Sequence, residues 1–376
     1  MQSVVKAWLY LFLILTTAAV DGQTQETDSL KNLRFRNISR ETGLSQNSVY
    51  DVLQDEKGFM WFATQDGLNR WDGYSIKVYR PDPEDESDSI PHNFVRALEL
   101  DRQGNIWIGT WGGGIAYFDP RKDRFFDLSV TADNGALPED TASVFDLEFD
   151  RKGDLWILTS EGSLYKGDPN ERSFDLIMDK PFVESISAGE SGVWIGTRQG
   201  VWRYDNSHAL LEQVVSPLEF NLNESLTAVK AVTEYEGALW IGTRSGIYRY
   251  NLEASELSRV KLPHEQEVSA VEITCIRVDA VGTIWVGTLD YGLYIRHAAG
   301  NIYHFRSKRG EPGALSGNRI LAVEATESGL LYVGTGTGGV DRVLPNGKAF
   351  NILLEESVWK IFEDSEQTMW FCMDGT

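Results

Sequence analysis

The stretch Gly58-Phe59-Met60-Trp61-Phe62-Ala63-Thr64 begins a sequence motif that is repeated as Gly104-Asn105-Ile106-Trp107-Ile108-Gly109-Thr110. Later copies are centred on Trp156, Trp194, Trp240, Trp285, Tyr332 and Trp370. Successive anchors lie 46, 49, 38, 46, 45, 47 and 38 residues apart. Self-similarity at a period of about 40–50 residues indicates a repeat architecture.

Each repeat contains four short apolar or β-branched runs separated by turn residues. One unit shows this clearly, with a first run at Ile273–Val278, the Trp285 run, and a last run at Ile302–Phe305. Sustained helical spacing of apolar residues is absent from the sequence after the N-terminal segment. Four antiparallel strands per roughly 45 residues, repeated radially, predict an all-β fold, a seven-bladed β-propeller with the start of an eighth repeat.

The second position after each anchor is a glycine in five repeats, namely Gly109, Gly196, Gly242, Gly287 and Gly334. We expect this small residue to lie at the narrow inner end of a tapering blade. Ala63, Leu158 and Cys372 depart from the pattern, and Leu158 is the largest intrusion. The threonine that follows is expected to satisfy backbone groups of the next turn, and the next glycine to adopt a positive φ.

Composition limits the possible partners. The formal net charge of −21 over 376 residues argues against a nucleic-acid or anionic-membrane surface. Seven of the 12 tryptophans are repeat anchors, so their number requires no cofactor. Cys275 and Cys372 lie far apart within predicted strands, and we interpret them as small buried hydrophobic residues rather than a disulfide or metal pair.

The order of segments predicts an exported protein. Residues 1–22, with Lys6 ahead of the apolar run Ala7–Val20, are predicted to form a signal peptide, with an uncleaved anchor helix as the alternative. The repeats start near Val49, Phe94, Val144, Val183, Leu226, Ile273 and Ile320, so residues 23–357 are assigned to the propeller.

Two further segments flank these repeats. Residues 358–376 are assigned to the start of a further repeat or a second propeller, because another first run begins near Val358. The sequence stops inside the hairpin after Trp370, so we expect it to be a piece of a longer chain. Arg34–Ile38 is predicted to be an isolated strand that completes a blade, either the one around Tyr332 or a later one.

Motifs for catalysis or metal binding are weak. Gly334–Gly339 matches G-x-G-x-x-G, but the following residues indicate a strand instead of the helix that a nucleotide site requires. The five histidines are scattered, and the acidic stretch Asp82–Asp88 is most simply a solvated loop. We predict no cofactor, no metal and no catalytic residue.

A ligand site is predicted on the face where the hairpins between second and third strands emerge. Aromatic faces stack on sugars and arginine pairs with carboxylates, so we expect ligand contacts from Trp111, Arg198, Arg244 and Tyr291. Asn47, Asn93 and Asn318 end three loops two residues before a strand, and they either contact the ligand or cap the inner strand as turn formers.

The repeat pattern, clearest in Asp101–Asp119 and Gly237–Asn251, resembles the two-component regulator propeller repeat. This resemblance implies a periplasmic sensor region that binds a small molecule or oligosaccharide. The output would be a histidine kinase or diguanylate cyclase, reached through a membrane segment downstream of this sequence, in a protein that forms a homodimer. The alternatives are a secreted propeller enzyme, such as a lyase or hydrolase, and a protein–protein interaction scaffold.

Overall fold

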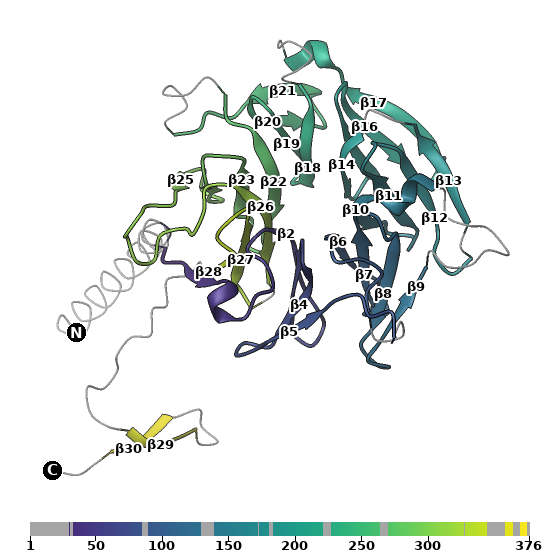
Figure 1. Ribbon diagram of the computed structural model, residues 1–376. Coiled ribbons are helices and arrows are strands. Elements are labelled where there is room, and N and C mark those ends of the chain that lie inside the picture. Colours follow the sequence, from purple (N-terminus) through teal and green to yellow (C-terminus); the bar gives the residue numbers. More distant parts are fainter. Residues whose placement is uncertain are drawn as a thin grey trace, which may run out of the picture.

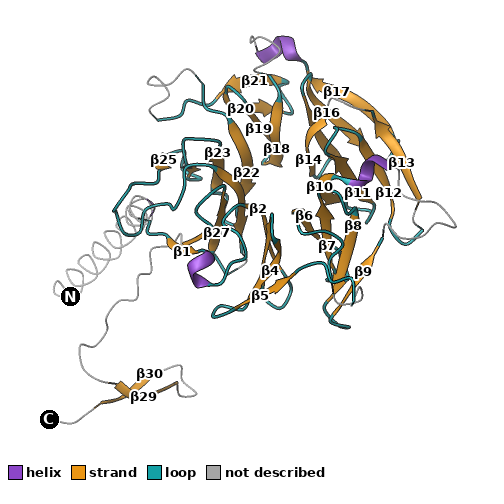
Figure 2. Cartoon of the chain, viewed as in Figure 1, coloured by secondary structure: helices purple, strands orange, loops and turns teal. Residues whose placement is uncertain are grey.

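The computed structural model describes residues 30, 33–84, 89–128, 139–171, 173–179, 183–220, 227–263, 270–326, 328–343, 358–363 and 369–373. Seven four-stranded antiparallel sheets stand around a central axis (Figure 1; Figure 2). The described helices are three short 3-10 segments, η2 (Arg40–Thr42), η4 (Glu139–Ala142) and η5 (Pro217–Phe220). The chain is therefore an all-β, seven-bladed β-propeller, as the repeat predicts.

In blades one to six the strands follow chain order from the axis outward, and each strand pairs only with its neighbours in sequence. Blades one to three consist of β2 (Val49–Gln54), β3 (Met60–Thr64), β4 (Gly67–Trp71) and β5 (Ile76–Tyr79); β6 (Val95–Leu100), β7 (Ile106–Thr110), β8 (Ile115–Asp119) and β9 (Arg124–Asp127); β10 (Val144–Phe149), β11 (Leu155–Thr159), β12 (Leu164–Asp168) and β13 (Ser173–Met178).

Blades four to six consist of β14 (Val183–Ala188), β15 (Val193–Thr197), β16 (Gly200–Asp205) and β17 (Leu210–Val215); β18 (Val229–Tyr235), β19 (Ala238–Thr243), β20 (Gly246–Asn251) and β21 (Glu256–Arg259); β22 (Ile273–Val278), β23 (Ile284–Thr288), β24 (Leu293–Arg296) and β25 (Ile302–Phe305). The predicted repeat starts agree with the inner strands to within three residues, the largest difference being Leu226 against Val229.

The seventh blade is completed by the N-terminal strand. Strands β26 (Ile320–Ala325), β27 (Leu331–Thr335) and β28 (Val340–Val343) come from one end of the ring, and β1 (Arg36–Ile38) pairs antiparallel with β28. Asn37 lies opposite Asp341 and donates to its carboxylate at 3.0 Å. The isolated strand thus joins the blade around Tyr332, which the sequence left open.

The structure describes none of the predicted signal peptide and only part of the segment after the seventh blade. The signal peptide at residues 1–22 lies outside the described residues. Strands β29 (Val358–Glu363) and β30 (Met369–Met373) form a two-stranded sheet with a register shift after Val358, which is the shift found in each blade of the ring. The assignment of this hairpin to a second propeller stays a prediction.

An aspartate six residues before the anchor explains the spacing of the repeat. In blade two, Asp101 accepts the backbone N–H groups of Gln103 and Asn105 through Oδ1, at 2.9 and 2.8 Å. Its Oδ2 accepts the indole N–H of Trp107 at 2.9 Å. The same indole bond joins Asp55 to Trp61, Asp150 to Trp156 and Asp279 to Trp285, at 2.8 to 3.1 Å. One carboxylate therefore shapes the turn and satisfies a buried donor.

Blade four lacks this aspartate and uses its neighbour instead. Ala188 occupies the position six residues before Trp194. The indole N–H of Trp194 donates to Glu234 of blade five at 2.8 Å, and Glu234 also accepts the backbone N–H of Glu190 at 2.9 Å. The indole N–H of Trp194 is therefore hydrogen-bonded as in the other blades, but here the bond links blade four to blade five.

The glycines after the anchors contact the next blade, as the taper predicts. A Cβ on Gly109 would lie 2.6 Å from Val144 Cγ1 in blade three, and one on Gly242 would lie 2.5 Å from Ile273 in blade six. A Cβ on Gly334 would lie 3.1 Å from Val49 Cγ1 in blade one, so the same close approach is found where the ring closes. A side chain is excluded at Gly109 and Gly242 because the first side chain of the next inner strand packs directly onto the glycine.

The turns after the second strands follow the prediction. The hydroxyl of Thr64 donates to the carbonyl of Gly67 at 2.8 Å, and that of Thr197 donates to Gly200 at 2.9 Å. Gly67 and Gly200 have φ values of 107° and 98°, which favour glycine. Consecutive strands are antiparallel, so these hairpins and the loops between blades emerge on one face, here called the loop face. The turns between third and fourth strands, such as Asp72–Ser75, lie on the opposite face.

The close approach of blades two and three can be tested by a double-mutant cycle. We expect Gly109→Ala to lower the free energy of unfolding by roughly 1–3 kcal/mol, because the new methyl group overlaps Val144. Val144→Ala alone costs about 2 kcal/mol or more through the cavity that it leaves. The double variant should lose less than the sum of the two, measured by urea unfolding; strict additivity would contradict the proposed clash.

The indole–carboxylate bond makes a second prediction. Asp101→Ala leaves the buried Trp107 donor and two turn N–H groups unpaired, so we expect a loss of about 2 kcal/mol or more in unfolding free energy. The matched variant is Thr326→Ala in blade seven, where the hydroxyl bonds to the turn residues Ser328 and Leu330 but to no indole, because the anchor is Tyr332. A loss at Asp101 no larger than that at Thr326 would show that the indole bond contributes little.

Candidate ligand site at the mouth of the central channel

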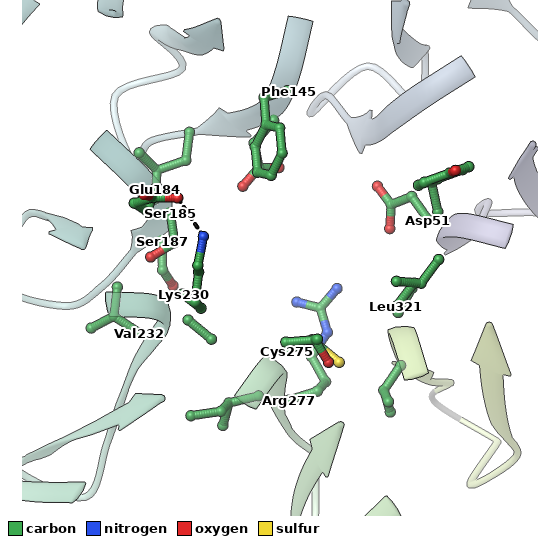
Figure 3. A pocket seen from close by; sticks show the side chains of 18 of the residues that line it. Asp51, Phe145, Glu184, Ser185, Ser187, Lys230, Val232, Cys275, Arg277 and Leu321 are labelled. Atoms are coloured by element: carbon green, nitrogen blue, oxygen red, sulfur yellow. Dashed lines mark hydrogen bonds and ion pairs between the residues drawn. The ribbon is translucent and has the colours of Figure 1, made fainter. Parts of the chain in front are cut away.

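The inner strands of the seven blades surround a cavity of about 400 Å³ along the axis of the ring. All seven strands contribute residues to its wall. The volume lies within the range of pockets that hold small ligands. Figure 3 shows side chains from several blades pointing into this central channel.

A β-bulge in every inner strand aims one residue at the axis. In each blade the pairing of first and second strands shifts register after the first residue of the inner strand. A bulge leaves the extra residue unpaired and redirects its side chain. The seven bulged residues all line the channel: Tyr50, Arg96, Phe145, Glu184, Lys230, Thr274 and Leu321. We call this set the upper ring, because inner strands begin at the loop face.

Three residues further along, the same strands form a second level, which lies about 10 Å deeper at the usual rise of a strand. Its members that line the channel are Glu99, Glu148, Ser187, Thr233 and Arg277. Arg277 points into the channel (Figure 3) and its guanidinium pairs with Glu324 of blade seven at 2.9 Å. Asp51 and Asp146 lie between the two levels and also line the wall.

Acidic side chains crowd the deeper part of the channel. Burial raises the pKa of Asp51 to about 6. Burial, with Glu148 and Asp51 nearby, raises the pKa of Asp146 to about 8. Burial and the same neighbouring charges raise the pKa of Glu99 well above its usual value, and burial raises that of Glu148. Glu324 and these acids raise the pKa of Arg277, which is the cation at this depth.

Two of these acids also connect neighbouring blades. Asp51 of blade one accepts the backbone N–H of Leu98 in blade two at 2.8 Å. Glu148 of blade three accepts the backbone N–H of Ala188 in blade four at 2.9 Å. These two carboxylates therefore have a structural role that does not depend on a ligand.

The upper ring carries a paired basic group on blades four and five. Glu184 accepts from Lys230 at 2.6 Å and from Arg198 at 2.7 Å, and Figure 3 shows Lys230 directed at Glu184. Burial alone would raise the pKa of Glu184, but these two hydrogen bonds outweigh it and hold the pKa below its usual value. One blade further on, Arg244 Nε lies 3.8 Å from Glu272 Oε1, a looser ion pair without a hydrogen bond.

On blades one to three the mouth is aromatic. Trp111, which is 42% exposed in a hairpin of the loop face, stacks on Phe94 with ring centroids 5.7 Å apart. Phe94 lies 4.9 Å from Tyr50. The guanidinium of Arg96 follows, 5.1 Å from the Tyr50 ring and 4.2 Å from that of Phe145. We call these five residues the aromatic ladder, because they run from the rim to the upper ring.

The structure brings some predicted site residues together and separates others. Trp111 heads the aromatic ladder, and Arg198 and Arg244 reach the mouth, where each pairs with a glutamate of this chain. Tyr291 is not among the described lining residues. The centroid of its ring lies 5.5 Å from the guanidinium of Arg306, the residue that directly follows the outermost strand β25.

The three predicted asparagines connect blades through their backbone. The carbonyl groups of Asn47, Asn93 and Asn318 accept the N–H groups of Gly339, Gly67 and Gly292, each in the hairpin of the preceding blade. The side chains of Asn47 and Asn318 accept the backbone N–H groups of Arg40 and Ser307. This geometry favours the turn-forming role over ligand contact.

Sequence reasoning missed the upper ring. Its signal is present, because the residue after the first buried residue of each inner strand varies from Tyr to Arg, Phe, Glu, Lys, Thr and Leu. A strand pattern alone does not show a bulge, so these positions pass for ordinary members of the strand. Cys275 is partly buried, packs as a free thiol against the core of blades six and seven and also lines the channel, whereas Cys372 lies outside the described side chains. Burial raises the pKa of the Cys275 thiol to about 11.

The described part of the chain contains neither a metal-binding cluster nor a membrane-spanning helix. Its His, Cys, Asp and Glu side chains form no group of three or more that could hold a metal ion. Its helices include none with the length and apolar character needed to cross a membrane.

The fold and channel define a repeat-built ring with a polar axial cavity. The family model for the two-component regulator propeller matches residues 43–66 and 89–112, which confirms the repeat family expected from the sequence. A 56-residue segment is 46% identical to histidine kinase P4 of Formosa agariphila, covering 15% of this chain and 4% of that protein.

Solved structures extend the likeness to the whole ring. The extracellular domain of BT3049, assigned to a hybrid two-component system of B. thetaiotaomicron, aligns with a TM-score of 0.70 and 20% identity, over 92% of this chain and 47% of that one. The extracellular domain of BT4673 from the same organism aligns with a TM-score of 0.68 and 20% identity, over 90% of this chain and 44% of that one. A streptogramin B lyase aligns with a TM-score of 0.61 and 16% identity, over 83% of this chain and 97% of that one.

These likenesses show the fold. The chain is a propeller similar to extracellular domains of two-component sensor systems, and it spans about half the length of those domains.

The buried acids predict that stability falls as pH rises. A carboxyl group whose pKa is raised on folding binds its proton more tightly in the native state, so its stabilising effect is lost as pH rises through the native value. We expect the melting temperature to decline as pH increases from about 4, near the ordinary pKa of an aspartate, up to about 6 for Asp51 and about 8 for Asp146, and to level off above these values. Asp146→Asn should raise the melting temperature above pH 8 and flatten the decline.

The control is Asp175→Asn on the exposed side of β13, which makes the same change away from the channel. Differential scanning calorimetry across this pH range measures both variants. A flattening of equal size in the two variants would contradict an origin in the channel.

Proposed function

We propose that this chain is the ligand-sensing, extracytoplasmic region of a bacterial transmembrane signalling protein. The observation that carries the proposal is the aromatic ladder, which leads from an exposed tryptophan at the rim to a charged axial cavity. The repeat family and the likeness to extracellular sensor domains support this role.

The mouth of the channel suits a small ligand. Binding sites combine apolar or aromatic walls with a few placed polar groups. Here aromatic side chains stand on blades one to three, opposite the Lys230–Glu184 pair on blades four and five. The exposed face of Trp111 offers a stacking surface, which favours a carbohydrate-like ligand.

The relay lies in parts of the protein beyond the ring. We propose periplasmic export by the segment at residues 1–22, a second propeller that begins near Val358, and a membrane segment further downstream. The output is a histidine kinase or diguanylate cyclase, and the kinase match to Formosa agariphila favours the former. Ligand binding would act by shifting the packing of blades or the geometry of a homodimer.

The ligand-binding role can be tested with a panel of plant and algal oligosaccharides. We expect at least one to raise the melting temperature of the chain, and Trp111→Ala to weaken its binding about tenfold or more, because the stacking surface is lost. Isothermal titration calorimetry measures the affinities. The matched control is Tyr74→Ala, an aromatic residue that is 95% exposed on the opposite face.

Three outcomes separate the possibilities. Equal weakening by the two substitutions would place the site elsewhere. Release of cleavage products during the incubation would favour the alternative of a secreted propeller enzyme. The absence of any shift across the panel would count against a carbohydrate-like ligand.

A further inference from the structure

Arg96 differs from the other basic residues of the channel wall. Three basic residues line the described channel, and two of them have carboxylate partners, Lys230 with Glu184 and Arg277 with Glu324. Arg96 has no hydrogen bond and no ion pair within the described chain. Its guanidinium is instead held between the rings of Tyr50 and Phe145, at 5.1 and 4.2 Å.

This stacking prepares the guanidinium for an anion. Aromatic faces on two sides restrict the orientation of the group and attract its charge. The N–H donors of guanidinium lie in its plane, so stacking leaves the fork of parallel donors unused. A residue that is already oriented loses less entropy when it binds, which makes the position favourable for a ligand. Gln65 supports the arrangement by donating to the Tyr50 hydroxyl at 2.7 Å.

The nearby acids do not occupy this fork. Asp51 accepts the backbone N–H groups of Val52 and Leu98, at 2.8 Å each. Asp146 accepts the backbone N–H of Leu147 at 3.0 Å, and its carboxyl group, with a pKa of about 8, is largely protonated at neutral pH. The charge of Arg96 is therefore attracted by both acids but paired with neither.

We propose that Arg96 binds the carboxylate of a small ligand, such as an acidic sugar or another cyclic organic acid, at the mouth of the central channel. This inference rests on the proposed function, since it names the ligand class for the same site. A carboxylate presents two parallel oxygens that match the guanidinium fork. The ring of the ligand would extend along the aromatic ladder toward Trp111. Arg198 and Arg244, which the sequence suggested for this task, are paired with Glu184 and Glu272.

The position also makes binding depend on pH. Asp146 faces Arg96 from β10 and Asp51 from β2. Glu148 lies further along β10, and Glu99 lies on β6, the strand of Arg96 itself. Ionisation of Asp146 places a new negative charge beside the bound carboxylate. Affinity for the ligand therefore falls as pH rises through about 8, and Asp146→Asn removes most of this dependence.

The test uses the full chain and two pairs of probes, D-glucuronate against D-glucose and benzoate against benzyl alcohol, at constant ionic strength. We expect saturable binding of at least one carboxylate probe and none of its neutral partner. Arg96→Met should weaken binding about tenfold to a hundredfold, because charged hydrogen bonds are lost. Arg96→Lys keeps the charge without the fork and should bind less tightly than the wild type.

The matched control is Arg70→Met. Arg70 also stacks on aromatic rings, 5.0 Å from Phe59 and 5.7 Å from Trp61, but on β4, the third strand of blade one. Full affinity is expected in this variant, and circular dichroism checks that each variant is folded.

Each contrary result has one meaning. Unchanged carboxylate binding in folded Arg96→Met overturns the proposal, as does equal binding of inorganic sulfate, which would indicate a general anion site. If neutral oligosaccharides bind and neither carboxylate probe does, the proposal fails while the sensing function stands. If neither the oligosaccharides nor the acids bind, both fail.

Discussion

The close approach of neighbouring blades near the axis is the constraint on which this structure depends. The residue two positions after each anchor tryptophan touches the first inner-strand residue of the next blade, and at Gly109 and Gly242 a single methyl group would overlap it. A ring of seven wedges closes only if each wedge is thin at this point. The indole–carboxylate bond at the other end of the same strand holds the turn that joins the inner strand to the second strand.

The repeat tolerates exceptions when the same physical requirement is met in another way. Trp194 lacks the preceding aspartate in its own blade, and Glu234 of the next blade accepts the hydrogen bond from its indole N–H. Leu158 replaces glycine in blade three and is fully buried against Val183 of blade four. In both places a local departure from the pattern is absorbed at the boundary between two blades. Interactions across that boundary therefore decide which substitutions the ring accepts.

In the channel wall the backbone repeats from blade to blade, whereas the side chains do not. One backbone feature, the bulge, recurs in all seven inner strands, yet it presents seven different side chains to the axis. The scaffold repeats because packing between blades must repeat, whereas the axis is hollow and places no such demand. The unpaired guanidinium of Arg96 and the neighbouring acids with raised pKa values are costly features for stability, which is typical of binding sites.

The sequence by itself determined the blade. The Trp period, the glycine two residues later and the polar turns follow from local packing and turn chemistry, and they predicted seven sheets, the taper and the exposed Trp111. Tertiary structure alone decided which side chains meet. Closure by β1, the ion pairs that occupy Arg198 and Arg244, and the stacking of Arg96 between Tyr50 and Phe145 all join residues of different strands or blades. The physical reason is that repeats set distances within one blade, whereas contacts at the axis depend on the bulge and on ring closure, which no local pattern encodes.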